Sequence, residues 1–250
     1  MIKKVIAIVG ATNSGKTALA VKLAKEINGV IISADSRQIY RGLDVGTNKE
    51  GKQSEFLGYT SRIIEEIPQL LIDQMEITQK FTLNDWLILA KEMIDKLWKN
   101  GNVPIVVGGT GLYITALLEG YVPGSGRHAK IKNEVDFNSI ILSPKVSRDE
   151  LFKKSDQRIE RIFDRLVEET RQLRTDARNI GWLKTIGLDY KFASDYLDGL
   201  LTKPQAIEQL KKASRAYIRR QQTWWRHHGT IHEIENYSKL VELVDNFLND

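Results

Sequence analysis

Residues 5–17 read VIAIVGATNSGKT, an apolar run followed by a complete G-x-x-x-x-G-K-T phosphate loop. The run is typical of a buried parallel strand. The glycines of the loop let backbone N–H groups turn inward around phosphate oxygens, and the helix that follows adds its positive N-terminus. A purely structural glycine turn is the alternative, but the strand before the loop and the helical pattern after it favour phosphate binding. The predicted phosphate site consists of Gly10, Thr12, Asn13, Ser14, Gly15, Lys16 and Thr17.

Further apolar runs at 30–33, 103–107 and 139–142 suit buried strands, and they alternate with helical patterns. Strand, loop and helix repeating in this order predict a parallel sheet covered by helices on both faces. The fold class is therefore α/β with a P-loop NTPase-like sheet. We expect a core over 1–145 and a mainly helical C-terminal part over 146–250, which packs on the core and lines the substrate channel.

The amino-acid composition limits which metals and bonds the protein can contain. The chain has 250 residues, 42% of them hydrophobic, with no cysteine and four histidines. It can hold neither disulfides nor thiolate metal sites, which leaves oxygen ligands for any metal, and we expect Mg²⁺ at Thr17. No apolar run is long enough to span a membrane, and the N-terminus does not resemble a signal peptide. We expect a cytoplasmic monomer.

A carboxylate follows the second predicted strand, at Asp35, 18 residues beyond Thr17. Enzymes that hydrolyse or transfer phosphoryl groups usually carry a metal-binding carboxylate after another strand, but 103–107 is followed by Gly108-Gly109-Thr110-Gly111. Asp35 is the remaining candidate, and a helix N-cap is the alternative for it. The glycine-rich turn at 108–111 lies at the same expected edge of the sheet, where Thr110 could also be a helix cap.

The basic residues concentrate near the C-terminus. The net charge is only +5, yet seven Lys or Arg residues and one acid lie between 203 and 228. On the helix expected from Pro204, Lys211, Arg215 and Arg219 repeat at four-residue spacing. Three cations on one face favour an anionic partner such as pyrophosphate or an RNA backbone, and a solvated face is the alternative. We expect Trp224 and Trp225 to pack in the protein core or between its parts and not to stack on bases.

Five segments together resemble the tRNA dimethylallyltransferases, also called tRNA isopentenyltransferases. They are GATNSGKT at 10–17, ISADSRQIYRGLDVGTNK at 32–49, VGGTGLYITALLEG at 107–120, IGLDYKFASDYLDG at 186–199 and ASRAYIRRQQTWWR at 213–226. They occur in the family's order over most of the chain. The resemblance implies that the loop binds dimethylallyl diphosphate and that an alkyl group, not a phosphoryl group, is transferred.

The resemblance also implies roles for single residues. The acceptor would be N6 of an adenosine beside the anticodon, in the tRNA anticodon stem-loop, with Asp35 as general base. Thr17 with Mg²⁺, Lys16 and Arg215 would neutralise the departing pyrophosphate, so Asp35, Thr17 and Arg215 are the catalytic candidates. The residues implied to contact adenosine or tRNA are Asp35, Ser36, Arg37, Gln38, Thr110, Arg219 and Arg220.

Two departures from the family pattern qualify the expected activity. Ala11 replaces the usual proline in the loop, and the helical insertion that grips the anticodon arm is reduced to about 121–138. Three activities stay open: tRNA modification, transfer to a free adenine nucleotide, and a small-molecule kinase or phosphate-binding module. We favour the first, with further RNA contacts from Arg158, Arg161, Arg165, Arg171, Arg174 and Arg178.

Overall fold

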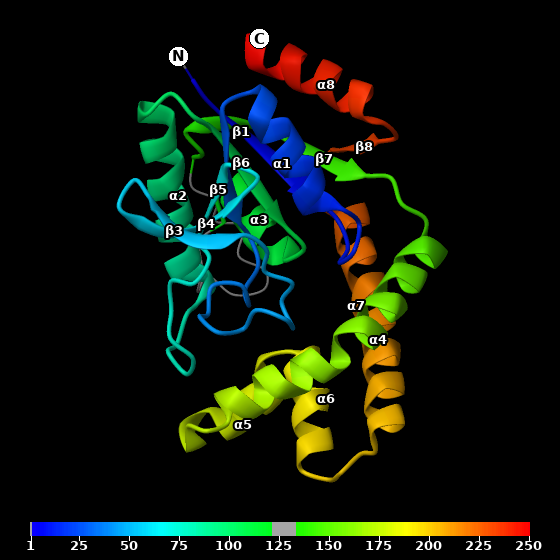
Figure 1. Cartoon of the computed structure of the whole chain (residues 1–250). Coiled ribbons are helices and arrows are strands. Elements are labelled where there is room, and N and C mark those ends of the chain that lie inside the picture. The colour runs from blue at the N-terminus through cyan, green and yellow to red at the C-terminus, as the bar shows by residue number, and fades with distance from the viewer. Residues whose placement is uncertain (1, 122–133) are drawn as a thin grey trace.

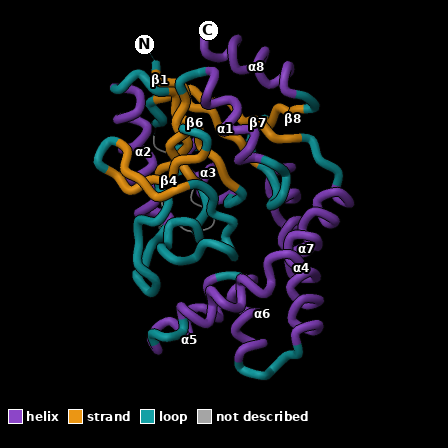
Figure 2. Tube along the Cα trace, viewed as in Figure 1, coloured by secondary structure: helices purple, strands orange, loops and turns teal. Residues whose placement is uncertain are grey.

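The computed structural model describes residues 2–121 and 134–250, and its centre is an eight-stranded sheet (Figures 1 and 2). The strand order is β3-β4-β5-β2-β6-β1-β7-β8, and the sheet is parallel from β5 to β8. The parallel strands are β5 (Ile67–Leu70), β2 (Gly29–Ser33), β6 (Val103–Gly108), β1 (Lys3–Val9), β7 (Phe137–Pro144) and β8 (Ile231–Ile234). The predicted α/β class and the four predicted strands are confirmed.

β5 was not predicted, and neither were two further strands beyond it at the edge of the sheet. β3 (Lys52–Phe56) and β4 (Tyr59–Ile64) pair in an antiparallel hairpin, and β4 pairs with β5 in the same sense. β3 is almost entirely exposed, so its sequence, KQSEF, carries no apolar pattern. β8 escaped prediction for a similar reason, because it is a short edge strand with one buried side chain.

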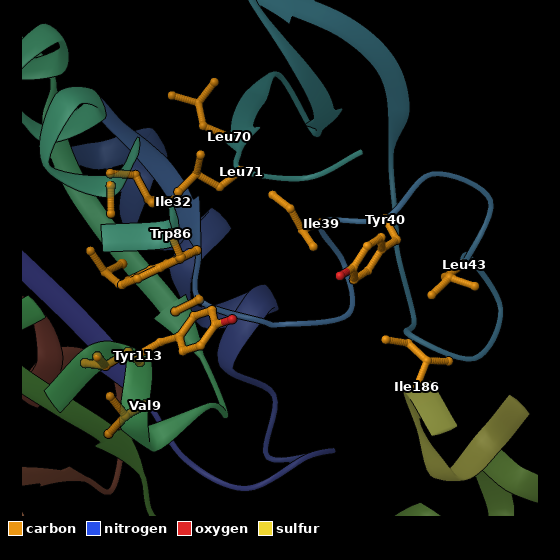
Figure 3. Packing of buried hydrophobic residues seen from close by; sticks show 14 of the residues in the cluster. Val9, Ile32, Ile39, Tyr40, Leu43, Leu70, Leu71, Trp86, Tyr113 and Ile186 are labelled. Carbon is orange, nitrogen blue, oxygen red and sulfur yellow. The ribbon is translucent and has the colours of Figure 1, made fainter. Parts of the chain in front are cut away.

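Helices cover both faces of the sheet because successive side chains of a strand point to opposite sides. On one face, α1 (Lys16–Glu26) and α8 (Tyr237–Asn249) pack on Ile6 and Ile8. On the other face, α2 (Leu83–Lys99) and α3 (Gly111–Leu118) cover Val5 and Val9. Figure 3 shows the second cluster, in which the rings of Trp86 and Tyr113 lie together with centroids 4.9 Å apart.

The remaining helices form a layer that extends from the carboxyl end of the sheet (Figure 1). They are α4 (Arg148–Leu173), α5 (Ala177–Ile186), α6 (Leu188–Leu197) and α7 (Lys203–His227). The chain then returns to the sheet as β8 and α8, so its C-terminal end belongs to the core layer and not to the helical part. Of the predicted short insertion at about 121–138, residues 122–133 lie outside the described part. None of the described helices is both long and apolar enough to cross a membrane.

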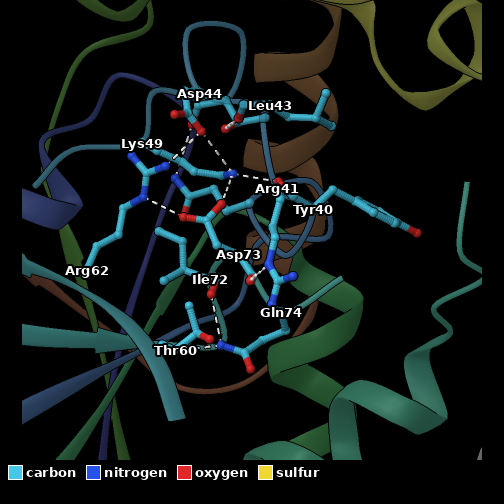
Figure 4. Close-up of polar contacts among 12 residues, drawn as sticks. Tyr40, Arg41, Leu43, Asp44, Lys49, Thr60, Arg62, Ile72, Asp73 and Gln74 are labelled. Carbon is cyan, nitrogen blue, oxygen red and sulfur yellow. Dashed lines mark hydrogen bonds and ion pairs between the residues drawn. The ribbon is translucent and has the colours of Figure 1, made fainter. Parts of the chain in front are cut away.

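A buried network of charges anchors the hairpin to the loop that follows β2 (Figure 4). The Lys49 ammonium, with a fully buried side chain, donates to Asp73 and, at 3.2 Å, to Asp44. Arg62 on β4 contacts the same two carboxylates, through Nε to Asp73 at 2.6 Å and Nη2 to Asp44 at 2.8 Å. Two cations and two anions therefore satisfy one another, with Lys49, Arg62 and Asp73 buried and the Asp44 side chain 42% exposed.

Replacing Lys49 by methionine is expected to destabilise the protein by about 3 kcal/mol, because removing one partner leaves buried Asp73 undercompensated. For a chain of this size that corresponds to a fall in Tm of about 6–12 °C. Thermal unfolding followed by circular dichroism measures it, with Lys99→Met on the exposed end of α2 as the control. Equal melting temperatures for the two variants would contradict the prediction.

Candidate active site

The phosphate loop connects β1 to α1 in a tight turn. Gly10 has a φ of 142°, a conformation that glycine adopts readily, and Gly15 directly precedes the first helical residue, Lys16. The N–H of Ser14 donates to the Ala11 carbonyl at 3.2 Å. The N–H groups at the start of α1 have no acceptor within the helix, so the loop presents donors to an anion.

The Lys16 ammonium lies over this turn, where Nζ donates to the Ala11 carbonyl at 2.8 Å. Desolvation lowers the pKa of Lys16 to about 8, while the charge of Asp35 acts in the opposite direction. A carbonyl is a weaker partner for this ammonium than an anion, because hydrogen bonds between ionised groups are roughly twice as strong. The half-buried lysine is therefore placed to gain from a phosphate.

Asp35 follows β2, and only one of its carboxylate oxygens forms hydrogen bonds with the part of the chain that the structure describes. Oδ1 accepts from the N–H of Arg37 at 2.8 Å and from that of Gln38 at 3.4 Å. Residues 36–39 form a turn and not a helix, so the alternative interpretation of Asp35 as a helix N-cap is wrong. Within the described residues Oδ2 has no hydrogen-bond partner, which leaves it available to a substrate.

Two adjoining cavities meet at Asp35. The first, of about 450 Å³, is lined by the phosphate-loop residues Asn13, Lys16 and Thr17. The second, of about 390 Å³, is lined by residues that include Arg37 and Arg220. Both cavities share Thr12, Asp35, Thr47, Asn48, Arg158 and Tyr217. A molecule bound by its phosphates on one side could thus meet a second molecule on the other, with Asp35 in the lining that the two cavities share.

The residues predicted to contact adenosine and tRNA do not all line the same cavity. Ser36, Arg37 and Arg220 line the second cavity. The Gln38 side chain instead joins two protein segments, since Oε1 accepts from Ser33 Oγ at 2.8 Å and Nε2 donates to the Thr47 carbonyl at 3.1 Å. Thr110 is the N-cap residue of α3, makes no side-chain cap hydrogen bond and lines neither cavity.

The three cations at four-residue spacing face the protein itself. Lys211 pairs with Glu160 at 2.5 Å, and Arg215 Nε donates to Asp156 at 3.1 Å. Arg219 lies over the Phe152 ring, 5.7 Å from its centroid. For Lys211 and Arg215 the facing anions are carboxylates of α4 at matching four-residue spacing, whereas Arg219 is exposed and its contact with an external anion stays a prediction. Arg215 lines neither cavity, and its catalytic role stays a prediction.

Gln221 is a site residue that sequence reasoning missed. Its Oε1 accepts from the N–H of Thr12 at 2.9 Å and its Nε2 donates to the Gly109 carbonyl at 3.0 Å, so α7 joins the two glycine-rich turns. A Cβ on Gly109 would come within 2.4 Å of that amide nitrogen. The available signal was a glutamine on the apolar face of the helix, and it is only 5% exposed. Both tryptophans nearby pack as predicted, Trp225 in the core and Trp224 stacked on His228.

The fold and the site define a phosphate-loop α/β protein in which the cavity at the loop adjoins a second cavity, with Asp35 lining both. The family described as IPP transferase matches residues 38–138 and 125–228. The chain belongs to the IPP transferase family, and the resemblance drawn from its motifs is confirmed.

Individual relatives agree with this assignment. The tRNA dimethylallyltransferase of Lactococcus lactis subsp. cremoris (strain MG1363) is 31% identical over 301 aligned residues, which cover 98% of this chain and 99% of the relative. That of Streptococcus pneumoniae serotype 19F (strain G54) is 30% identical over the full length of both chains. The full-length tRNA isopentenylpyrophosphate transferase of Bacillus halodurans superimposes with a TM-score of 0.80 at 27% identity, covering 99% of this chain and 96% of that one.

The alignment with the Lactococcus enzyme also measures how much shorter this chain is. At least 51 aligned positions, the difference between 301 and 250, have no residue here. The two ranges that match the family model, 38–138 and 125–228, overlap at residues 125–138.

Proposed function

We propose that the protein transfers the dimethylallyl group of dimethylallyl diphosphate to N6 of an adenosine next to the tRNA anticodon and releases pyrophosphate. The observation that carries the proposal is the free oxygen of Asp35 at the junction of two cavities, one of them lined by the phosphate loop. The family relationship supports the same reaction class. We further propose that the protein acts as a monomer in the cytoplasm and reads the anticodon stem-loop.

The reaction needs help at two points. The exocyclic amine of adenine is a poor nucleophile because its lone pair is conjugated with the ring, and the diphosphate must leave with its electrons. As N6 attacks the allylic carbon, the carbon–oxygen bond breaks, a carbon–nitrogen bond forms, and the N6 proton passes to Asp35 Oδ2. Lys16 and the N–H groups of the loop stabilise the charge that develops on the pyrophosphate.

The site fits a magnesium ion that arrives with the diphosphate. In the described residues no group of three or more acidic or histidine side chains could hold a metal. The Thr17 hydroxyl lines the phosphate cavity, and diphosphate oxygens would complete the ligand set that Mg²⁺ prefers. When bound, the ion would neutralise charge on the leaving group. Thr17 is thus the proposed protein ligand.

The second cavity is the proposed place of the acceptor base. An adenosine stacked in an RNA loop has to be extruded before its N6 can reach a recessed carbon. Arg37 and Arg220 line this cavity, and neither has an acidic partner among the described residues, so they are available to the phosphates that flank an extruded base. Arg219 and Thr110 lie outside it, and their contacts with tRNA stay predictions.

The experiment that tests this function incubates the protein with Mg²⁺ and dimethylallyl diphosphate labelled in the allyl group. Unmodified tRNA and AMP are offered as acceptors in parallel reactions. We expect label in tRNA alone, and we expect EDTA to abolish the transfer. Label only in AMP would show that a free nucleotide, and not tRNA, is the acceptor. Label in neither acceptor would overturn the proposed transferase activity. ADP formed from ATP without a prenyl donor would indicate a kinase.

A further inference from the structure

Residues 44–48 form a wall of the second cavity without belonging to any helix or strand. Gly46, Thr47 and Asn48 line that cavity, and the last two also line the phosphate cavity. Two turn hydrogen bonds, from Asn48 N–H to Val45 O at 3.3 Å and from Lys49 N–H to Asp44 O at 3.0 Å, leave most of its backbone groups to be satisfied by other parts of the protein. The groups that do so here come mainly from the helical part of the protein.

Glu169 on α4 accepts hydrogen bonds from three consecutive N–H groups of this wall. Oε2 accepts from Asp44 at 3.1 Å and from Val45 at 2.8 Å, and Oε1 accepts from Gly46 at 3.4 Å. The same Oε1 accepts from the hydroxyl of Tyr190 on α6 at 2.7 Å. One carboxylate thus collects four donors from two separate parts of the chain.

Arg158 binds the carbonyls of the same segment. Its Nη2 donates to Val45 O at 2.8 Å and to Gly46 O at 3.1 Å. Its Nη1 lies 3.4 Å from Asp189 on α6. Arg158 and Glu169 are 11 residues apart on α4, or about three turns, so they lie on the same side of the helix. The helix therefore holds the N–H groups of the wall at one point and its carbonyls at another.

The Tyr190 ring packs closely against the wall. A Cβ on Gly46 would come within 2.7 Å of the Tyr190 ring, so the wall approaches the ring as closely as a glycine permits. Burial and the nearby charge of Glu169 raise the pKa of the Tyr190 phenol well above its usual value. The phenol therefore stays protonated and donates to Glu169 at any pH at which the enzyme would work.

The wall is also linked to the turn that carries the proposed base. The Thr47 carbonyl accepts from Gln38 Nε2, and Gln38 Oε1 accepts from Ser33 at the end of β2. Gln38 lies in the turn that Asp35 caps with Oδ1. A displacement of residues 44–48 would therefore reach the surroundings of the proposed base through one side chain.

We propose that Glu169 is a positioning residue of the transfer reaction, which holds residues 44–48 as the acceptor-side wall beside Asp35. This inference rests on the proposed function. Glu169 lines neither cavity, so it acts through the wall and not on the substrate. Among the described residues the phosphate loop shares no hydrogen bond with Glu169, and only Thr47 and Asn48 of the wall line the phosphate cavity, so diphosphate binding should depend on Glu169 less than the acceptor does.

The test compares Glu169→Gln with Glu168→Gln. The two variants lose the same charge at adjacent positions, but Glu168 is half exposed, and its only polar partners among the described residues are Arg171 and Gln172 on its own helix. In Glu169→Gln the amide oxygen can replace one carboxylate oxygen, while the new NH₂ faces the N–H of Gly46. We expect kcat/KM for tRNA to fall about 10-fold or more, the effect of one or two lost hydrogen bonds to a charged group.

Two further measurements separate positioning from general loosening of the fold. The Kd for pyrophosphate with Mg²⁺ should change much less than kcat/KM for tRNA, because the loop itself keeps its hydrogen bonds and only Thr47 and Asn48 of the wall line its cavity. Hydrogen exchange in the protein alone should accelerate at residues 44–46 in Glu169→Gln and not in Glu168→Gln. Tyr190→Phe, which keeps the ring and removes one donor, should give a smaller loss in the same direction.

Equal kcat/KM for tRNA in the two glutamine variants, with an active wild type, would overturn the positioning role alone. A parallel loss of pyrophosphate affinity and transfer rate would also overturn it, since both sites would then be loosened together. A wild type that labels no tRNA would overturn the proposed function, and the positioning role with it.

Discussion

Asp35→Asn is expected to slow dimethylallyl transfer by about 10²- to 10⁴-fold, the usual contribution of a positioned general base. The amide oxygen of asparagine can still accept from the N–H of Arg37, so the turn after β2 should keep its shape. The amide group cannot take up the N6 proton. Single-turnover measurements with saturating tRNA isolate this step from product release.

The binding of pyrophosphate separates loss of the base from loss of the site. The Kd for pyrophosphate should be unchanged or slightly lower in Asp35→Asn, because a negative charge near Lys16 is removed. Asp245→Asn on the exposed side of α8 controls for the change in net charge. A transfer rate within threefold of the wild type would show that another group accepts the proton.

Lys16→Met is expected to weaken pyrophosphate binding by about 10²- to 10³-fold, the usual effect of removing one donor from a site that stabilises an anion. Methionine fills a similar volume without an ammonium, so the loop loses its charge and little of its packing. Isothermal titration in the presence of Mg²⁺ measures the affinity. Lys25→Met on the exposed side of α1, which loses a charge of the same helix, should bind as the wild type does.

The same lysine predicts a pH dependence of diphosphate binding. Because the pKa of Lys16 is lowered to about 8 in the free protein, the ammonium is charged below pH 8 and increasingly neutral above it. A bound anion favours the charged form, so binding takes up a proton above pH 8 and the affinity falls as the pH rises. The ligand's own titration is common to both proteins, so the difference between the wild-type and Lys16→Met profiles isolates the lysine. Parallel profiles from pH 7 to 9.5 would contradict the assignment.

The parts of the fold that could be predicted are those whose signals are local. The strands at 5–9, 30–33 and 103–107 are buried on both faces and therefore read as continuous apolar runs. The hairpin β3–β4 is stabilised instead by backbone pairing and by the buried charges of Arg62 and Asp73. A buried charged residue looks the same in the sequence as an exposed one, so no sequence pattern predicted the hairpin.

The candidate site also contains residues that could be predicted from local sequence and residues that could not. Lys16 and Asp35 could be assigned from the sequence because each follows a strand that fixes its position within a few residues. Gln221 contacts Thr12 across 209 positions, and Glu169 contacts Asp44 across 125, and no local pattern reveals such contacts. The ion pairs of Lys211 and Arg215 on α7 could not be predicted for the same reason, since their carboxylate partners lie on α4, more than 50 residues earlier.

The sequence alone thus determined that the chain builds a phosphate loop at the end of a parallel strand and places a carboxylate after the neighbouring one. These features follow from backbone geometry and from burial within single elements. Only the tertiary structure decided which oxygen of Asp35 is free, that Gln221 joins the two glycine turns, and that α4 holds the wall at 44–48. Those results depend on which buried donors and acceptors meet when distant segments pack, because each must find a partner once water is excluded.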